Sequence, residues 1–419
     1  MKCPYCGKPA KSDGGLRKHL TGTRPYGGHE LAPDVAARVA AEAADGETVP
    51  ASEFPAPAPT AAVRAVVDTG LGPQSPGEPA FRAQMRRHQS WYRSQVLGLP
   101  YGTGPSQNST ERYGNMLRPA DAEAGANFLT PSIFRLAQER IASSAGVERF
   151  RCLHNMLSSQ PMCFNIFGPL VDDLELATRL IGALLPGEVE EVLDVRIEHA
   201  PPEGRRALGD KTSFDAFVVY RRPDQGRGLL GIETKLTEPF SSKSYDTPRY
   251  RDITSGSPHV WKREHLNQLQ DVRWNQLWRN HLLVEASRTA EGQEDGRLVV
   301  VYHADDPDCR TAIQGYRSLL TDPDRSLVLW PLDRLAATWN GLLGEGTEAS
   351  WLQELERRYV DLSGESSPDR WPLLETEARG ERSGADDRAP GGAPVQGRQR
   401  RVGDPGASPG ARQPPSGGH

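Results

Sequence analysis

Two apolar runs separated by a polar turn dominate the middle of the chain. The runs cover 213–220 and 228–237 and are rich in β-branched, aromatic and leucine side chains. Between them stands RRPDQGRG, a sequence dense in turn-forming residues. Short runs of this kind, bounded by proline and glycine, predict two strands of a β-hairpin. The other predicted elements are arranged before and after this hairpin.

Hydrophobic spacing outside the hairpin predicts alternating helices and strands. The helical period is clearest at 172–185, and Pro186 and Gly187 end this predicted helix. The predicted helices are 172–185, 262–285, 311–320, 333–343 and 350–359, and the predicted strands are 189–199, 298–303 and 326–332. This alternation predicts an α/β fold, with a mixed central sheet flanked by helices.

Composition divides the chain into ordered and disordered parts. The 42 glycines and 35 prolines among 419 residues are concentrated in segments, mainly 46–79 and the stretch beyond 363. Such segments carry too few large apolar residues to bury a core. We therefore expect five parts: a small N-terminal module at 1–31, a flexible linker at 32–79, a helical and loop-rich part at 80–157, a sheet-containing core at 158–362 and a disordered tail at 363–419.

Charge and cysteine content limit the classes of protein to consider. The net charge is −5, so any attraction to nucleic acid must come from local patches. Five cysteines, two of them in one CxxC pair, favour a metal site in a reducing cytoplasm over a disulfide framework. No apolar run approaches the length of a membrane span. We expect a soluble cytoplasmic protein with no membrane partner.

The N-terminal module carries a metal-ligand pattern. The spacing C-x2-C-x12-H-x9-H provides four candidate Zn²⁺ ligands: Cys3, Cys6, His19 and His29. The first three match a two-Cys two-His zinc finger, whereas Ala10 replaces the usual aromatic residue and the histidines are widely spaced. Six basic against two acidic residues give this module a charge of +4. It could contact phosphates, bind another protein or serve only as a structural unit.

Three ionisable residues interrupt the apolar hairpin. Glu233 and Lys235 point to the same side of one strand, and pairing of the two strands brings Asp215 near Glu233. Two carboxylates suit a hard cation such as Mg²⁺ or Mn²⁺. A cation held there polarises a phosphoryl oxygen and lowers the pKa of bound water. The lysine can orient that water or stabilise developing charge. The alternative is a hairpin whose charged residues face only solvent.

This pattern resembles the PD-(D/E)XK nuclease superfamily, which has the restriction-endonuclease-like fold. Asp215 and the sequence Glu233-Thr234-Lys235 match its core motif, although Phe214 stands where the family often has proline. The stretches SSQPMCFNIFGPL, GDKTSFDAFVVY and IETKLTEPF extend the resemblance, toward bacterial restriction-type endonucleases, over about 81–362. The resemblance implies a restriction-endonuclease-like core at 158–362 that binds Mg²⁺ through Asp215 and Glu233.

The resemblance also implies supporting residues on two neighbouring helices. The helix before the first core strand often supplies a glutamate that faces the metal, and Glu175 is the candidate; Glu198, at the end of the first strand, is a second one. The helix after the ExK strand often supplies a glutamine. Gln268, Gln270 and Gln276 are eligible, and the polar neighbours of Gln276 favour it.

The predicted function is metal-dependent hydrolysis of DNA phosphodiester bonds, in restriction or defence. Two alternatives remain open: a nucleic-acid-binding or scaffold protein on a nuclease fold, and an RNA nuclease. The chain has no GxxxxGK[ST], HExxH or GxSxG motif, so no competing catalytic system is evident. The sequence leaves the oligomeric state open, a homodimer included.

Overall fold

The computed structural model describes residues 70–143, 146–343 and 346–364. The four predicted zinc ligands, almost all of the predicted linker and the predicted tail beyond 364 lie outside these residues. Within them, no helix combines the length and the apolar character needed to cross a membrane.

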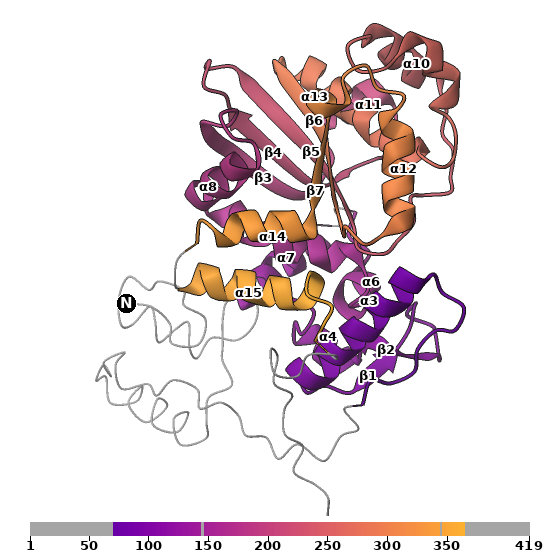
Figure 1. Ribbon diagram of the computed structural model, residues 1–419, viewed down its shortest axis with the longest axis vertical. Coiled ribbons are helices and arrows are strands. Elements are labelled where there is room, and N and C mark those ends of the chain that lie inside the picture. The colour runs from indigo at the N-terminus through magenta and orange to yellow at the C-terminus, as the bar shows by residue number, and fades with distance from the viewer. Residues whose placement is uncertain (1–69, 144–145, 344–345, 365–419) are drawn as a thin grey trace, which may run out of the picture. The chain divides into compact units, whose positions relative to one another are not determined.

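A mixed sheet of five strands forms the centre of the described chain (Figure 1). The strand order follows the sequence: β3 (Glu191–His199), β4 (Phe214–Arg221), β5 (Arg227–Lys235), β6 (Asp295–Tyr302) and β7 (Leu327–Pro331). The first three strands pair antiparallel, and β6 and β7 then add parallel to β5. The predicted α/β class with a mixed sheet is confirmed.

β5 is the central strand, and its sequence reflects that position. Every residue after Arg227 is buried, because β4 and β6 pair with its two edges and helices cover both faces. A strand buried on both faces reads as a continuous apolar run rather than as an alternating one. The polar residues at its end, Glu233 and Lys235, are therefore held in an interior that strongly disfavours unpaired charge.

Two apolar clusters lie on opposite faces of the sheet. One contains side chains from α7, α8, α14 and α15, together with alternate sheet residues such as Ile232 and Val299. The other contains side chains from α11 and α12, together with Leu229 and Leu298. The covering helices are α7 (Ser159–Asp172), α8 (Leu174–Leu184), α9 (Pro202–Leu208), α10 (Pro248–Gly256), α11 (Asn275–Ala290), α12 (Pro307–Arg317), α13 (Pro323–Ser326), α14 (Leu332–Asn340) and α15 (Thr347–Tyr359).

The part before α7 packs into the first of these clusters. It comprises α3 (Ala80–Trp91), which continues as a π-helical turn, η2 (Tyr92–Val96), and then α4 (Pro119–Glu123), α5 (Pro131–Ala142) and α6 (Arg149–His154). A small antiparallel pair, β1 (Tyr101–Thr103) and β2 (Arg112–Leu117), interrupts these helices. The sequence predicted helices and loops here but not this pair, whose strands are short and separated by turn residues.

The predicted helix 262–285 is wrong in its first half. A 3-10 helix, η3 (Arg263–Gln268), precedes α11, and Val272 is 49% exposed although it was expected in the buried stripe. Leu269 is buried as expected. The spacing of the leucines alone could not distinguish a 3-10 turn from a continuous α-helix. A single buried leucine such as Leu269 is compatible with either structure.

Candidate active site

The predicted hairpin places Asp215 and Glu233 at its open end. The ladder between β4 and β5 ends with the pair Ala216 and Ile232. Asp215 and Glu233 each lie one residue beyond this last pair, on facing strands. Asp215 Oδ2 accepts hydrogen bonds from the backbone nitrogen and the hydroxyl of Thr234, at 2.7 and 2.8 Å. The side chain of Asp215 thus bonds to β5 just where the backbone ladder between the two strands stops.

Lys235 forms a buried ion pair with Glu233. The two residues are two positions apart on β5, so their side chains leave the strand on the same face. Lys235 Nζ lies 2.8 Å from Glu233 Oε1, and the two side chains are 8% and 6% exposed. The structure therefore brings together the three residues of the motif: Asp215, Glu233 and Lys235.

Two amide side chains from α11 complete the surroundings of Glu233. Gln276 Nε2 donates to Glu233 Oε1, and Asn280 Nδ2 donates to Glu233 Oε2, each at 2.6 Å. Positions i and i+4 share one face of a helix, so both amides reach the same carboxylate. Gln276 Oε1 also accepts from Lys235 Nζ at 3.3 Å and from the backbone of Ser241 at 2.8 Å. Sequence reasoning singled out Gln276 but missed Asn280, although the spacing of four residues was available as a signal.

Glu198 supplies a third carboxylate to this centre. The residues on either side of Glu198 pair with the residues on either side of Asp215, so the two acids face each other across β3 and β4. Glu198 is 8% exposed and has φ +51°, an uncommon conformation for a residue other than glycine. Gln160 Nε2 donates to its Oε1 at 2.6 Å. Strained backbone of this kind concentrates at functional sites.

Glu175 is not brought to the centre. It is exposed in the first turn of α8, and among the residues that the structure describes it makes no hydrogen bond or ion pair with the other acids. Instead, α7 begins near the end of β3, and Gln160 in its first turn donates to Glu198. The sequence did not predict α7, because it contains Pro161 and Pro169, and proline usually ends a helix.

The two other eligible glutamines lie before α11. Gln268 ends η3 and contacts His265, and Gln270 donates to the carbonyl oxygen of Asn267 at 3.2 Å. Both are exposed. Of the three glutamines considered, Gln276 is the one that reaches Glu233.

Burial and mutual repulsion perturb the acids. Burial raises the pKa of Asp215 well above its ordinary value, and the charges of Glu233 and Glu198 raise it further. Burial raises the pKa of Glu198 to about 7; the hydrogen bond from Gln160 opposes this shift and the charge of Glu233 adds to it. Burial alone would lower the pKa of Lys235, but Glu233 and Asp215 outweigh it and raise this pKa, so the ammonium stays charged.

A model of the PD-(D/E)XK nuclease superfamily matches residues 76–361. The chain belongs to this superfamily. The match confirms the predicted resemblance and implies nuclease activity of the hydrolase class on a nucleic-acid substrate. Neither the curated proteins nor the solved structures contain a match to the chain. The zinc-finger-like part of the prediction has no support, because the match begins at residue 76 and the described residues begin at 70.

The donor atoms of the nuclease centre fit a hard divalent cation in kind. Asp215, Glu233 and Glu198 offer carboxylate oxygens, which Mg²⁺ and Mn²⁺ prefer. Both oxygens of Glu233 already accept hydrogen bonds from α11. Within residues 70–143, 146–343 and 346–364, no group of three His, Cys, Asp or Glu side chains has the geometry to coordinate a metal ion. A cation would therefore need these acids to rearrange around it.

A large groove begins directly after the catalytic strand. Its volume is about 1190 Å³, and its lining includes Thr237, Glu238 and Phe240 from the segment that follows Lys235. Lys235 Nζ lies 5.0 Å from the centre of the Phe240 ring. The opposite side of the groove comes from the start of α3 and from α12. The segment that lines this part of the groove therefore follows directly on the strand that carries Glu233 and Lys235.

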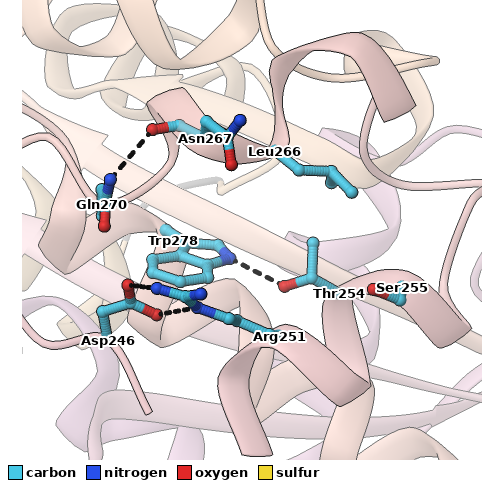
Figure 2. Close-up of a pocket in the computed structure, with 8 residues that line it drawn as sticks. All are labelled: Asp246, Arg251, Thr254, Ser255, Leu266, Asn267, Gln270 and Trp278. Atoms are coloured by element: carbon cyan, nitrogen blue, oxygen red, sulfur yellow. Dashed lines mark hydrogen bonds and ion pairs between the residues drawn. The ribbon is translucent and has the colours of Figure 1, made fainter. Parts of the chain in front are cut away.

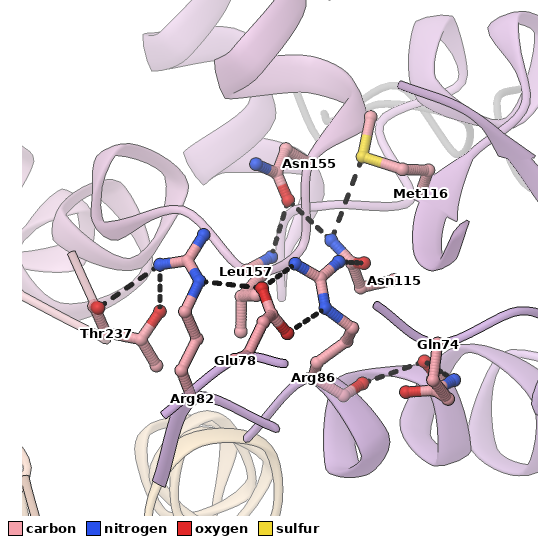
Figure 3. A network of polar contacts seen from close by, with 10 residues as sticks. Gln74, Glu78, Arg82, Arg86, Asn115, Met116, Asn155, Leu157 and Thr237 are labelled. Atoms are coloured by element: carbon pink, nitrogen blue, oxygen red, sulfur yellow. Dashed lines mark hydrogen bonds and ion pairs between the residues drawn. The ribbon is translucent and has the colours of Figure 1, made fainter. Parts of the chain in front are cut away.

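A polar network fixes the segment after β5 to α3 (Figure 3). Arg82 Nη1 donates to the carbonyl and hydroxyl oxygens of Thr237, at 3.2 and 3.0 Å. Glu78 accepts from both Arg82 and Arg86, and these hydrogen bonds, that of Arg86 foremost, lower the pKa of Glu78. Glu238 in turn accepts from the backbone of Ser159 at 2.7 Å, which ties the same segment to α7.

A smaller cavity lies apart from the acids (Figure 2). Its volume is about 170 Å³, and residues around α10, η3 and α11 line it. The ion pair between Asp246 and Arg251 and the Trp278 indole, which donates to Thr254 at 3.1 Å, define its walls. None of the three acidic residues of the candidate centre is among its lining residues.

Proposed function

We propose that this chain is a metal-dependent nuclease that hydrolyses DNA phosphodiester bonds and serves restriction or defence. The observation that carries the proposal is the meeting of Asp215, Glu233 and Lys235 at the open end of the hairpin in a chain of this superfamily. A decayed centre would be expected to have lost at least one of these residues, so their retention favours an enzyme over a scaffold.

Each residue has a role that follows from its surroundings. Asp215 and Glu233 would hold Mg²⁺ or Mn²⁺, with Glu198 as the third carboxylate; the cation would polarise the phosphate and acidify bound water. Gln276 and Asn280 orient the carboxylate of Glu233. Lys235, which stays charged, stabilises negative charge that develops on the phosphate oxygens.

The test uses the purified full-length chain with plasmid DNA, linear duplex DNA, single-stranded DNA and RNA. Each substrate is incubated with Mg²⁺, with Mn²⁺ and with EDTA, and a Glu233→Ala variant serves as the control for contaminating nucleases. The proposal expects cleavage of DNA that needs the cation and is lost in the variant. Cleavage of RNA alone would favour the RNA nuclease, and binding without any cleavage would favour the scaffold.

The N-terminal module is a separate part of the proposal. We propose that Cys3, Cys6, His19 and His29 bind one Zn²⁺, and that the +4 charge of residues 1–31 contacts DNA phosphates. Zinc content of the full chain and of a Cys3→Ser variant tests the first point. Equal DNA affinity of the full chain and a chain without residues 1–45, at low salt, would exclude the second.

A further inference from the structure

The nuclease centre presents an electrostatic problem to its substrate. Two buried acids, Glu198 and Glu233, share one site with the half-buried Asp215, and the ammonium of Lys235 is already paired with Glu233. A phosphodiester backbone is itself anionic, so it meets repulsion when it approaches. Cations at the rim of an active site attract such a substrate and hold it in register. Basic side chains that lie close to these acids and are not paired with them are the candidates for this role.

Arg151 is such a side chain. It belongs to α6 and is exposed, and with the residues that the structure describes it forms neither a hydrogen bond through its guanidinium nor an ion pair. The helix starts beside the third acid: the backbone nitrogen of Glu148 donates to Gln160 Oε1 at 3.2 Å, while Gln160 Nε2 donates to Glu198. The charge of Arg151 accordingly lowers the pKa of Glu198, against the larger effect of burial.

Arg140 approaches the same acid from α5. Its Nη2 donates to the backbone carbonyl oxygen of Glu198 at 2.7 Å. Its Nε is buried and has no hydrogen-bond partner within the described part of the chain. A guanidinium is a planar fork of five donors that matches the oxygens of a phosphate. Arg140 uses one arm to hold the backbone of Glu198 and has a further donor without an acceptor.

The neighbouring Arg149 shows the contrast. It lies two residues before Arg151 on the same short helix, but its Nη2 contacts both carboxylate oxygens of Glu123 at 2.6 Å. The charge of Arg149 is therefore paired with a carboxylate, whereas that of Arg151 forms no ion pair with any residue that the structure describes. The two arginines form a matched pair for an experiment.

We propose that Arg151 and Arg140 form a phosphate clamp that binds the sugar–phosphate backbone of the substrate on the Glu198 side of the nuclease centre. This inference rests on the proposed nuclease function and adds to it the element that positions the anionic substrate beside the acids. α5 and α6 thereby become part of the substrate-binding surface and not only a support for the sheet.

The binding test uses full-length protein, a fluorescein-labelled DNA that the wild type cleaves, and EDTA to prevent cleavage. Fluorescence anisotropy gives Kd at several salt concentrations. Arg151→Ala should raise Kd about 10-fold at low salt, since a charge-assisted hydrogen bond is lost. It should also reduce the slope of log Kd against log salt by about 0.9, the contribution of one phosphate contact. Arg149→Ala should leave both quantities unchanged, and Arg151→Lys should recover part of the loss.

Steady-state cleavage separates substrate binding from a structural role. Arg151→Ala should raise KM and leave kcat close to that of the wild type, and its melting temperature should equal that of Arg149→Ala. If Arg151→Ala and Arg149→Ala have the same Kd, salt slope and KM while the wild type binds and cleaves, the clamp is wrong and the nuclease function stands. If the wild type neither binds nor cleaves any nucleic acid, the proposed function fails and the clamp fails with it.

Discussion

The two sides of the nuclease centre treat their carboxylates differently. On the α11 side, Glu233 receives hydrogen bonds from Gln276 and Asn280 and an ion pair from Lys235. On the β3 side, Thr234 donates to Asp215 and Gln160 donates to Glu198, but burial and neighbouring carboxylates still raise the pKa of both acids. One side is compensated by the protein itself, whereas the other side holds acids that repel each other.

The contrast indicates which carboxylates would be stabilised most by a bound cation. A buried carboxylate is stable when donors or an opposite charge surround it and costly when they do not. The donors from α11 hydrogen-bond to both carboxylate oxygens of Glu233. A bound cation would favour the ionised forms of Asp215 and Glu198, whose pKa values are raised first by burial and then by neighbouring carboxylates. We infer that a metal ion stabilises the β3 side more than the α11 side.

The largest expected effect is the loss of cleavage when either central acid is removed. Asp215→Ala and Glu233→Ala should each reduce turnover about 10³-fold or more, since the stabilisation of the transition state by the metal is worth several kcal/mol. Initial rates of DNA cleavage under Mg²⁺ measure this. Glu175→Ala is the control, because that glutamate is exposed in α8 and should be neutral. Wild-type rates in Glu233→Ala would show that the centre lies elsewhere.

A somewhat smaller effect is expected for the lysine. Lys235→Ala should lower kcat on the order of 10²-fold, because it removes a fixed positive charge from the reacting phosphate. Metal binding should be largely retained, since the carboxylates remain. Single-turnover cleavage rates and a Mg²⁺ titration separate the two quantities, with the exposed Lys243→Ala as the matched control. Unchanged single-turnover rates would leave Lys235 only a structural partner of Glu233.

Removal of the side-chain amides that donate to Glu233 and to Glu198 should lower the free energy of unfolding by different amounts. Asn280→Ala leaves one buried oxygen of Glu233 without its donor, and such a loss costs about 1–3 kcal/mol. Gln160→Ala should cost less, because Glu198, with a pKa of about 7, can take up a proton when its donor is removed. Urea unfolding at pH 7 in EDTA compares the two variants, and the exposed Gln270→Ala is the control. A larger loss for Gln160→Ala would reverse the assignment of the two sides.

Local patterns in the sequence were sufficient to predict the hairpin and the strands around it. Strand alternation placed Glu233 and Lys235 on one face, and apolar runs located β3, β6 and β7 to within a few residues. Placement of Gln276 beside Glu233 followed from a resemblance and not from spacing. These features depend on local periodicity and on one short motif, both of which are visible in a single chain.

The third acid and its helix could not be predicted from local pattern. Glu175 and Glu198 were both candidates from the sequence, and nothing local distinguished them. The helix α7, which brings Gln160 to Glu198, was not predicted, because it contains two prolines. The positive φ of Glu198 and its position opposite Asp215 depend on the strand register, which no single stretch specifies. Likewise, the sequence could not indicate which of the two arginines of α6 is paired, because the ion pair between Arg149 and Glu123 joins residues far apart in the chain.

The most direct test of the contrast between the two sides is the melting temperature of two isosteric variants. Asp215→Asn keeps an oxygen that can accept from Thr234 and removes a charge that the folded state disfavours, since the pKa of Asp215 is raised on folding. Glu233→Gln replaces an acceptor oxygen by a donor that faces Asn280 or Gln276, and it breaks the ion pair with Lys235.

In EDTA at pH 8, Asp215→Asn should melt at a higher temperature than the wild type, and Glu233→Gln should melt at a lower one. A shift of about 2–4 °C per kcal/mol is expected for a domain of this size. Addition of Mg²⁺ should raise the melting temperature of the wild type and have much less effect on Asp215→Asn. A lower melting temperature for Asp215→Asn in EDTA, or an equal gain from Mg²⁺ in that variant, would contradict the account.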